Sequence, residues 1–145
     1  MSRRILVVAA AFATALAATA VVAQTDVVKQ RETLMKEFGN VTKPVGGMLR
    51  GSVPFDLAAV KAALDTYAKN AKVLPSLFPA GSGEGTDALP SVWERKAEFD
   101  GLFAKLASDA TAAKGAITDE ASFKANCPGV IRTCGTCHDS FRKKS

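Results

Sequence analysis

Two cysteines and the single histidine of this chain lie together near the C-terminus, as Cys134-Gly135-Thr136-Cys137-His138. The pattern Cys-x-x-Cys-His is typical of the covalent attachment of a c-type haem. The two thiols add across vinyl groups of the porphyrin, and the histidine ligates the iron on one axial side. Because His138 is the only histidine among the 145 residues, it is the one candidate for the proximal ligand. Ligation by two histidines of this chain is therefore excluded.

Three other chemistries use the same residue types. A thioredoxin-like redox pair normally starts a helix that follows a strand, whereas Cys134 and Cys137 lie late in a chain with a helical pattern. A zinc site would add Cys127 to Cys134, Cys137 and His138 as a Cys₃His set, but ligands from a single helix cannot easily surround a tetrahedral ion. A structural disulfide is the third alternative. Haem attachment remains the leading interpretation because it uses the whole pattern.

The N-terminus has the pattern of a secretory signal peptide. Arg3 and Arg4 precede an apolar run over residues 5–22, and small residues ending at Ala23 supply a cleavage site. An uncleaved membrane anchor is the alternative, since the run is about long enough to span a bilayer. We expect a signal peptide over 1–23 and a mature domain over 24–145 that does not span the membrane. Export also requires that the Cys-x-x-Cys pair be protected from oxidation, which covalent capture of haem provides.

Composition and charge favour a small helical domain. The chain is 48% hydrophobic with one Trp and one Tyr, which favours helix over sheet. The formal charge is +5, and loss of the two arginines of the signal peptide leaves +3 (5 − 2) in the mature chain. No basic stripe with interleaved aromatic residues occurs, which argues against nucleic acid as a partner.

Apolar residues recur three or four apart in four stretches of the mature chain. The spacing predicts helices over about 25–50, 57–74, 92–114 and 119–144. Short connections between four helices favour an antiparallel four-helix bundle, so we predict an all-α fold with covalently attached haem c.

Local signals predict where these helices begin and break. Asp56 and Asp119 are good N-caps, and Ser91 with Glu94 has the spacing of a capping box. Gly39 and Pro44 are expected to bend or divide the first helix, and Pro128-Gly129 to kink the last one.

The last helix carries the haem-attachment residues. Cys134 and His138 are four residues apart and share a face, while Cys137 is offset around the helix. One helix can thus hold the porphyrin at two points and present an imidazole to the iron. We expect the haem to lie inside the bundle, against the other helices.

The second axial side of the iron has several candidates: methionine, lysine, water or nothing. Met35 and Met48 remain after removal of the signal peptide. Met35 lies on the apolar side of the first predicted helix, four residues after Arg31. On residue pattern alone, a methionine on an apolar stripe belongs to the core more often than it ligates a metal.

The mature chain resembles the class II c-type cytochromes, the cytochrome c′ superfamily. The resemblance rests on Arg31-x-x-x-Met35, on the segments 51–56, 74–79 and 90–93, and on the C-terminal run 134–142, which occur in the family's order. Within the superfamily, the low-spin cytochrome c-556 branch has a ligating methionine at the position of Met35, whereas high-spin cytochromes c′ have an apolar non-ligand there.

The resemblance implies a periplasmic protein that carries single electrons through one covalent haem c, with its iron between His138 and Met35. It also implies that Arg31 contacts a haem propionate. The alternative is a five-coordinate haem protein of the cytochrome c′ type that binds nitric oxide or carbon monoxide. We expect a non-enzyme whose partners are other redox proteins of the periplasm, present as a monomer or a homodimer.

Overall fold

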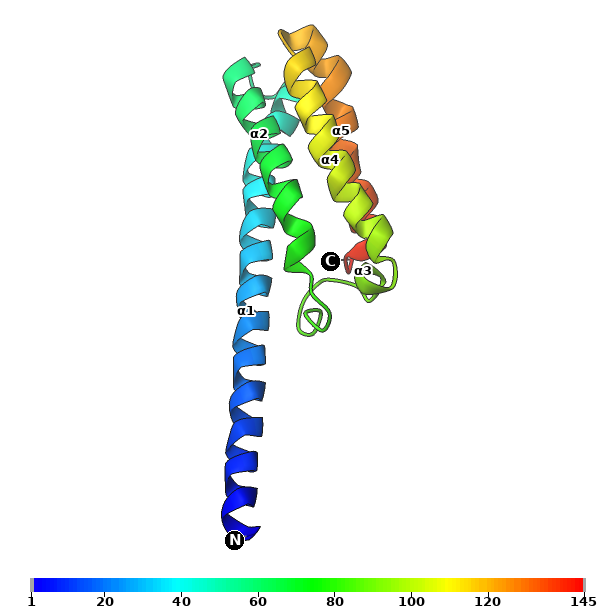
Figure 1. Ribbon diagram of the computed structural model, residues 1–145. Coiled ribbons are helices and arrows are strands. Elements are labelled where there is room, and N and C mark those ends of the chain that lie inside the picture. Colours follow the sequence, from blue (N-terminus) through cyan, green and yellow to red (C-terminus); the bar gives the residue numbers. More distant parts are fainter. Residues whose placement is uncertain (1, 145) are drawn as a thin grey trace.

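Four long helices form an antiparallel bundle in this computed structural model (Figure 1). The structure describes the backbone of residues 2–144 and the side chains of residues 26–144. The long helices are α1 (Ser2–Leu49), α2 (Leu57–Val73), α4 (Lys96–Ala116) and α5 (Glu120–Phe141). The signal peptide predicted over 1–23 lies outside the residues whose side chains are described, so it stays a prediction.

Two short helices complete the chain, the 3₁₀ turn η1 (Leu74–Leu77) and the single turn α3 (Ser91–Glu94). Residues 2–144 contain no strand, and their one isolated β-bridge joins Ala88 to Arg142. The predicted all-α four-helix architecture is therefore confirmed. Within the part of the chain with described side chains, no helix has an apolar stretch long enough to cross a membrane.

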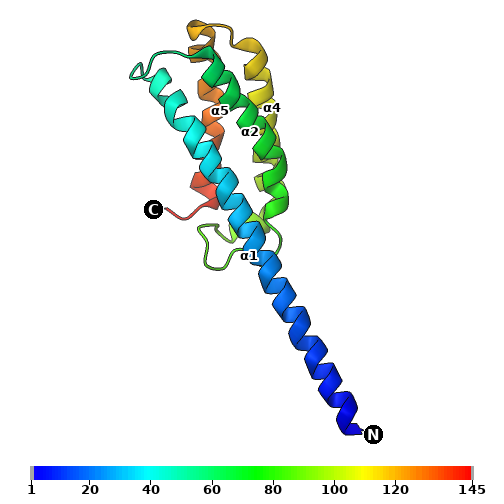
Figure 2. The same ribbon diagram turned by 90° about the vertical axis from the view of Figure 1, so that its left-hand side faces the viewer.

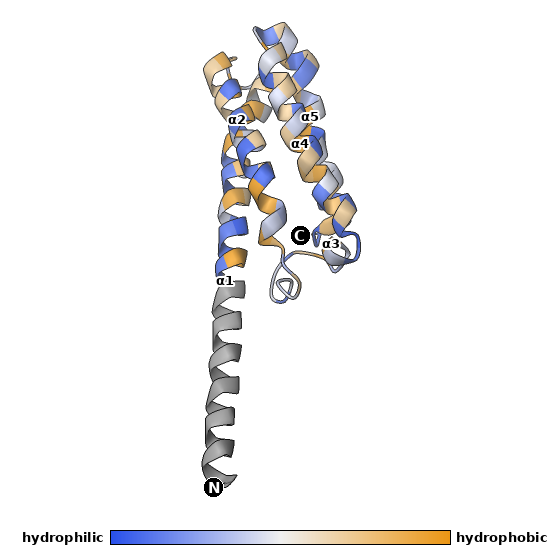
Figure 3. Ribbon diagram, viewed as in Figure 1, coloured by the Kyte–Doolittle hydropathy of each residue, from blue (hydrophilic) through white to orange (hydrophobic). Residues whose placement is uncertain are grey.

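The helices pack as two antiparallel pairs that meet through α2 and α4. α1 lies along α2, and α5 lies along α4 (Figures 1 and 2). Hydrophobic and hydrophilic residues are interspersed along α2, α4, α5 and the coloured part of α1 (Figure 3), and the buried ones face the centre of the bundle. The buried residues form one core, whose most completely buried large side chains are Tyr67, Phe123, Leu64, Leu74, Ile117, Val45, Val60 and Val92.

Both predicted aspartate caps are confirmed. The Asp56 carboxylate accepts a hydrogen bond from the Ala59 amide at 3.0 Å. The Asp119 carboxylate accepts one from the Ser122 amide at 2.7 Å, within a reciprocal capping box. Each aspartate thereby satisfies a backbone donor that has no partner inside the helix.

A helix begins at Ser91, close to the predicted start, but the predicted capping box and the unbroken helix to residue 114 are wrong. Ser91 does not cap a helix; its hydroxyl donates instead to the Ser140 carbonyl at the end of α5, at 2.8 Å. The chain also breaks at Arg95, with φ −119° and ψ 44°, so α3 and α4 are separate helices.

The prolines inside helices do not divide them. α1 continues through Gly39 and Pro44, and α5 continues through Pro128. The predicted division of α1 is therefore wrong, while the alternative of a bend in either helix stays a prediction.

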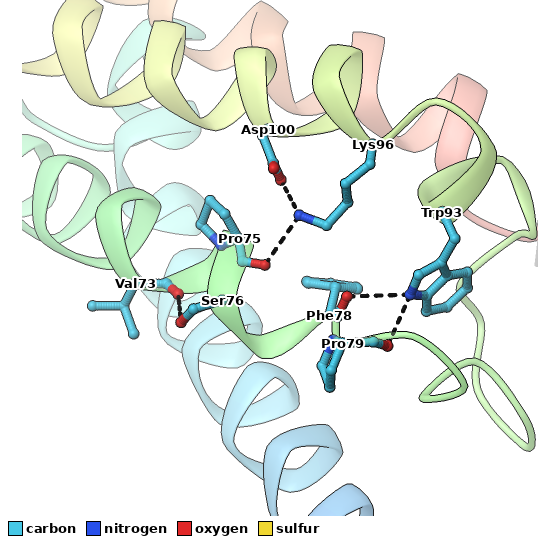
Figure 4. Close-up of polar contacts among 8 residues, drawn as sticks. All are labelled: Val73, Pro75, Ser76, Phe78, Pro79, Trp93, Lys96 and Asp100. Carbon is cyan, nitrogen blue, oxygen red and sulfur yellow. Dashed lines mark hydrogen bonds and ion pairs between the residues drawn. The ribbon is translucent and has the colours of Figure 1, made fainter.

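The connection between α2 and α4 is held by side chains of α3 and α4 (Figure 4). The Trp93 indole N–H is shared between the carbonyls of Phe78 and Pro79, at 3.1 and 2.9 Å. The Lys96 ammonium donates to the Pro75 carbonyl at 3.3 Å. These bonds fix the end of α2 and the following loop against the start of α4.

Candidate haem site

The three residues of the attachment motif lie on the C-terminal half of α5. Cys134 and Cys137 are half-buried, and Cys137 packs against the core, whereas His138 is exposed on the flank of the helix. A single continuous helix therefore presents two sulfurs toward the bundle and an imidazole beside them. The shared face predicted for Cys134 and His138 stays a prediction, because Cys134 is half-buried whereas His138 is exposed.

The electrostatic surroundings suit these three side chains to hold a haem. Partial burial, and then the positive charge of Arg142, lower the pKa of His138, with Asp139 opposing. The neutral imidazole, which is the form that ligates iron, is thus favoured. Burial raises the pKa of Cys137 to about 11 and that of Cys134 in the same direction. Both sulfurs are therefore thiols at neutral pH.

Met35 lies on α1, half-buried and packed against the core. Its neighbours one turn away are Arg31 and Phe38, both buried. The thioether thus projects from a helix whose position is fixed on both sides by buried residues.

Arg31 is 4% exposed and holds the loop that follows η1. Its guanidinium donates to the Leu77 carbonyl at 3.3 Å, to the Ser82 hydroxyl at 2.9 Å and carbonyl at 2.7 Å, and to the Thr86 hydroxyl at 3.2 Å. It also lies over the Phe78 ring, 4.4 Å from the centroid. Burial lowers the pKa of Arg31. Because both terminal nitrogens already donate to protein oxygens, the predicted propionate contact stays a prediction.

Tyr67 on α2 is a buried polar residue to which the sequence patterns assign no function. Its hydroxyl is 2.8 Å from the Thr42 hydroxyl on α1. Burial chiefly raises the pKa of Tyr67, to about 12, and the hydrogen bond with Thr42 opposes the rise. Tyr67 therefore joins α2 to α1 within the core of the bundle.

A groove runs between α1 and α5, lined by Gly39, Thr42, Lys43, Gly46, Leu49, Arg50 and Ile131. Gly39 is one turn from Met35, and Ile131 is one turn from Cys134. A Cβ added at Gly39 or at Gly135 would meet no atom within 4 Å. The lining also includes the charged Lys43 and Arg50, and none of the haem-attachment residues belongs to it. The fit to the cofactor therefore rests on the donor set, because two thiols and an imidazole on one helix are what a covalently attached haem requires.

Comparison with known proteins decides the family. The family model for cytochrome c′ matches residues 26–142. The chain belongs to the cytochrome c′ family. Cytochrome c′ of Rhodopseudomonas palustris is 55% identical over 125 residues, covering 85% of this chain and 86% of that protein. Cytochrome c-556 of Agrobacterium fabrum is 40% identical over 118 residues, covering 81% of each. The solved structure of the R. palustris cytochrome c′ matches with a TM-score of 0.80 at 53% identity, over 83% of this chain and 98% of that chain.

Proteins of the cytochrome c′ family bind haem c covalently, so haem c with its iron is the cofactor of this chain. The relatives have both names, cytochrome c′ and cytochrome c-556, and the c′ protein of R. palustris is the more similar of the two compared above. The comparisons therefore support the superfamily, and the choice between its two branches rests on this chain's own residues.

Proposed function

We propose that this protein is a periplasmic carrier of single electrons. One haem c is attached at Cys134 and Cys137, and its iron is ligated by His138 on one side and Met35 on the other. The single observation that carries the proposal is the placement of Met35. It is a half-buried thioether against the core, one turn from the groove between α1 and α5.

When bound, haem supplies the one-electron chemistry, and a methionine ligand raises its reduction potential. The chain's residues hold this centre rigid. The surroundings of His138 favour its neutral form, and Met35 lies one turn from two buried residues of α1, Arg31 and Phe38. Two protein ligands leave no open position on the iron, which suits electron transfer rather than catalysis. We therefore propose a carrier and not an enzyme.

A second candidate function is the capture of nitric oxide or carbon monoxide by a five-coordinate haem. The 55% identity to a protein named cytochrome c′ favours it. The two candidates differ in one bond, because gas binding requires that Met35 leave the iron free.

The absorption spectrum of the purified ferric protein tests the choice. Electron transfer through a His/Met haem predicts a low-spin spectrum with a sulfur-to-iron charge-transfer band, which Met35→Leu abolishes. Met48→Leu is the matched control, because Met48 is a buried methionine on the same helix, 4% exposed, and should leave the band intact. A high-spin wild-type spectrum, unchanged by Met35→Leu, would refute ligation by Met35.

Location and partners belong to the same proposal. We propose export by a cleaved signal peptide, other periplasmic redox proteins as partners, and a monomer or homodimer. Cell fractionation with a haem stain and N-terminal sequencing of the mature chain tests the first of these. Haem-stained protein in the cytoplasm with residues 1–23 still attached would contradict it.

A further inference from the structure

We propose that Tyr67 is a positioning residue that sets how firmly Met35 binds the iron, through its hydrogen bond to Thr42. The inference rests on the proposed function, since it requires Met35 to be a ligand. It assigns a role to a buried polar side chain that the haem-attachment motif does not include.

Because of how the helices pack, the distance between Met35 and the iron depends on the contacts that hold α1 in place. The iron is fixed to α5 by the attachment residues, whereas Met35 belongs to α1. α1 packs on α2 and on η1, while α5 packs on α4 and α3. The separation between the two axial ligands is therefore set indirectly, through the elements that hold α1 in place.

Tyr67 is placed to fix this separation. It is 1% exposed, its ring meets the Phe38 ring edge-on at 5.7 Å, and its hydroxyl reaches Thr42 at 2.8 Å. Phe38 and Thr42 follow Met35 by three and seven residues, so they extend the same side of α1.

The direction of the hydrogen bond shows what the tyrosine acts on. The Thr42 hydroxyl donates its one proton to the Phe38 carbonyl at 2.7 Å. Tyr67 must therefore be the donor to Thr42, and its own proton is used in holding α1. The phenol thus acts on the helix that carries Met35, and not as a donor to a molecule bound at the iron.

Loss of a neutral hydrogen bond of this kind typically changes an equilibrium about fivefold, which corresponds to about 1 kcal/mol. Without the Tyr67–Thr42 bond, α1 is freer to move away from α5. The ratio of Met35-bound to Met35-free iron should fall by about this factor. An external ligand that must displace Met35 should then bind about five times more tightly.

Imidazole binding to the ferric holoprotein, followed by absorption spectroscopy, measures this ratio. Tyr67→Phe and Thr42→Val should each lower the apparent Kd for imidazole about fivefold. The double variant should give the same value as either single variant, because both remove one shared bond. Thr33→Val is the matched control, since the Thr33 hydroxyl donates to the Lys29 carbonyl of its own helix, at 2.9 Å, and to no other helix among the described residues. It should leave the Kd unchanged.

The Met35→Leu background separates positioning from other effects. There Tyr67→Phe should no longer change imidazole affinity, because no methionine competes. An undiminished effect in that background would overturn the inference. If the wild type is low-spin and Tyr67→Phe binds imidazole with the same Kd as the wild type, the inference is also overturned. That result leaves the proposed function standing. A high-spin wild type whose imidazole affinity is unaltered by Met35→Leu would overturn both.

Discussion

The hydrogen bonds from the Arg31 guanidinium to Leu77, Ser82 and Thr86, here called the Arg31 clasp, give the sharpest prediction about stability. Arg31→Gln should lower the free energy of unfolding substantially, whereas Arg50→Gln, at the exposed residue that follows the end of α1, should change it little. The difference follows from burial, because the Arg31 guanidinium is 4% exposed and its partners belong to a loop 46 to 55 residues further along the chain.

The size of the effect can be worked from the contacts. The 2.7 Å bond to the Ser82 carbonyl and the 2.9 Å bond to its hydroxyl are the closest. Hydrogen bonds to a charged group contribute about 1.5 kcal/mol each at the lower end, or about 3 kcal/mol for the two. The contact with the Phe78 ring adds about 0.5 to 1 kcal/mol, and relief of the buried charge offsets part of the sum. We expect a loss of about 3 kcal/mol, or about 10 °C in Tm for a domain of this size.

Denaturant unfolding of the haem-loaded protein, followed by circular dichroism, provides the measurement. Arg31→Lys keeps the charge but loses the planar fork, so it should recover only a minor part of the loss. Limited proteolysis should cut Arg31→Gln first within residues 80–86, because the loop loses its clasp. If Arg31→Gln and Arg50→Gln lose the same small amount of stability, the clasp does not hold the loop and the reasoning is wrong.

Three further predictions concern other contacts. Gly83→Ala should destabilise the protein by about 1 to 3 kcal/mol, because the new Cβ would lie 2.6 Å from the Trp93 ring; denaturant unfolding measures it, and a neutral effect would show that the loop gives way. The pKa of Tyr67 is raised to about 12, so the unfolded chain loses this proton first, and stability falls as pH rises from about 10 to 12, by up to about 3 kcal/mol. Tyr67→Phe should lack this part of the alkaline loss, and identical alkaline titrations of the two proteins would contradict it. Hydrogen bonds from Ser122 lower the pKa of Asp119, so its stabilisation is lost as pH falls through the folded-state value; Asp119→Asn should show a shallower acid loss in circular dichroism, and an equally steep one would count against the cap.

Local chemistry predicts well those features whose partners are near in sequence. The caps at Asp56 and Asp119 bond to amides three residues away, so spacing suffices to find them. The same holds for the helical pattern of the last segment, which places Cys134, Cys137 and His138 on one helix.

Features that depend on distant partners could not be found this way. Ser91 and Glu94 have the spacing of a capping box, but the Ser91 hydroxyl donates its hydrogen bond to the distant Ser140 carbonyl instead. Tyr67 reads as a core residue until Thr42, 25 residues earlier, is seen beside it. The sequence does mark Arg31 as unusual, since a charged residue occupies an apolar position of the helix. Its acceptors could not be predicted, because the segment that contains them has no regular spacing of apolar residues.

The most direct test of the central claim is the NMR spectrum of the ferrous protein with isotopically labelled methionine methyl groups. A methyl group bound through sulfur to the iron lies over the haem ring, whose ring current moves its resonance strongly upfield. We predict one such resonance, present in the wild type and in Met48→Leu and absent in Met35→Leu. A wild-type spectrum with no upfield methionine methyl, or one that survives Met35→Leu, would contradict the account.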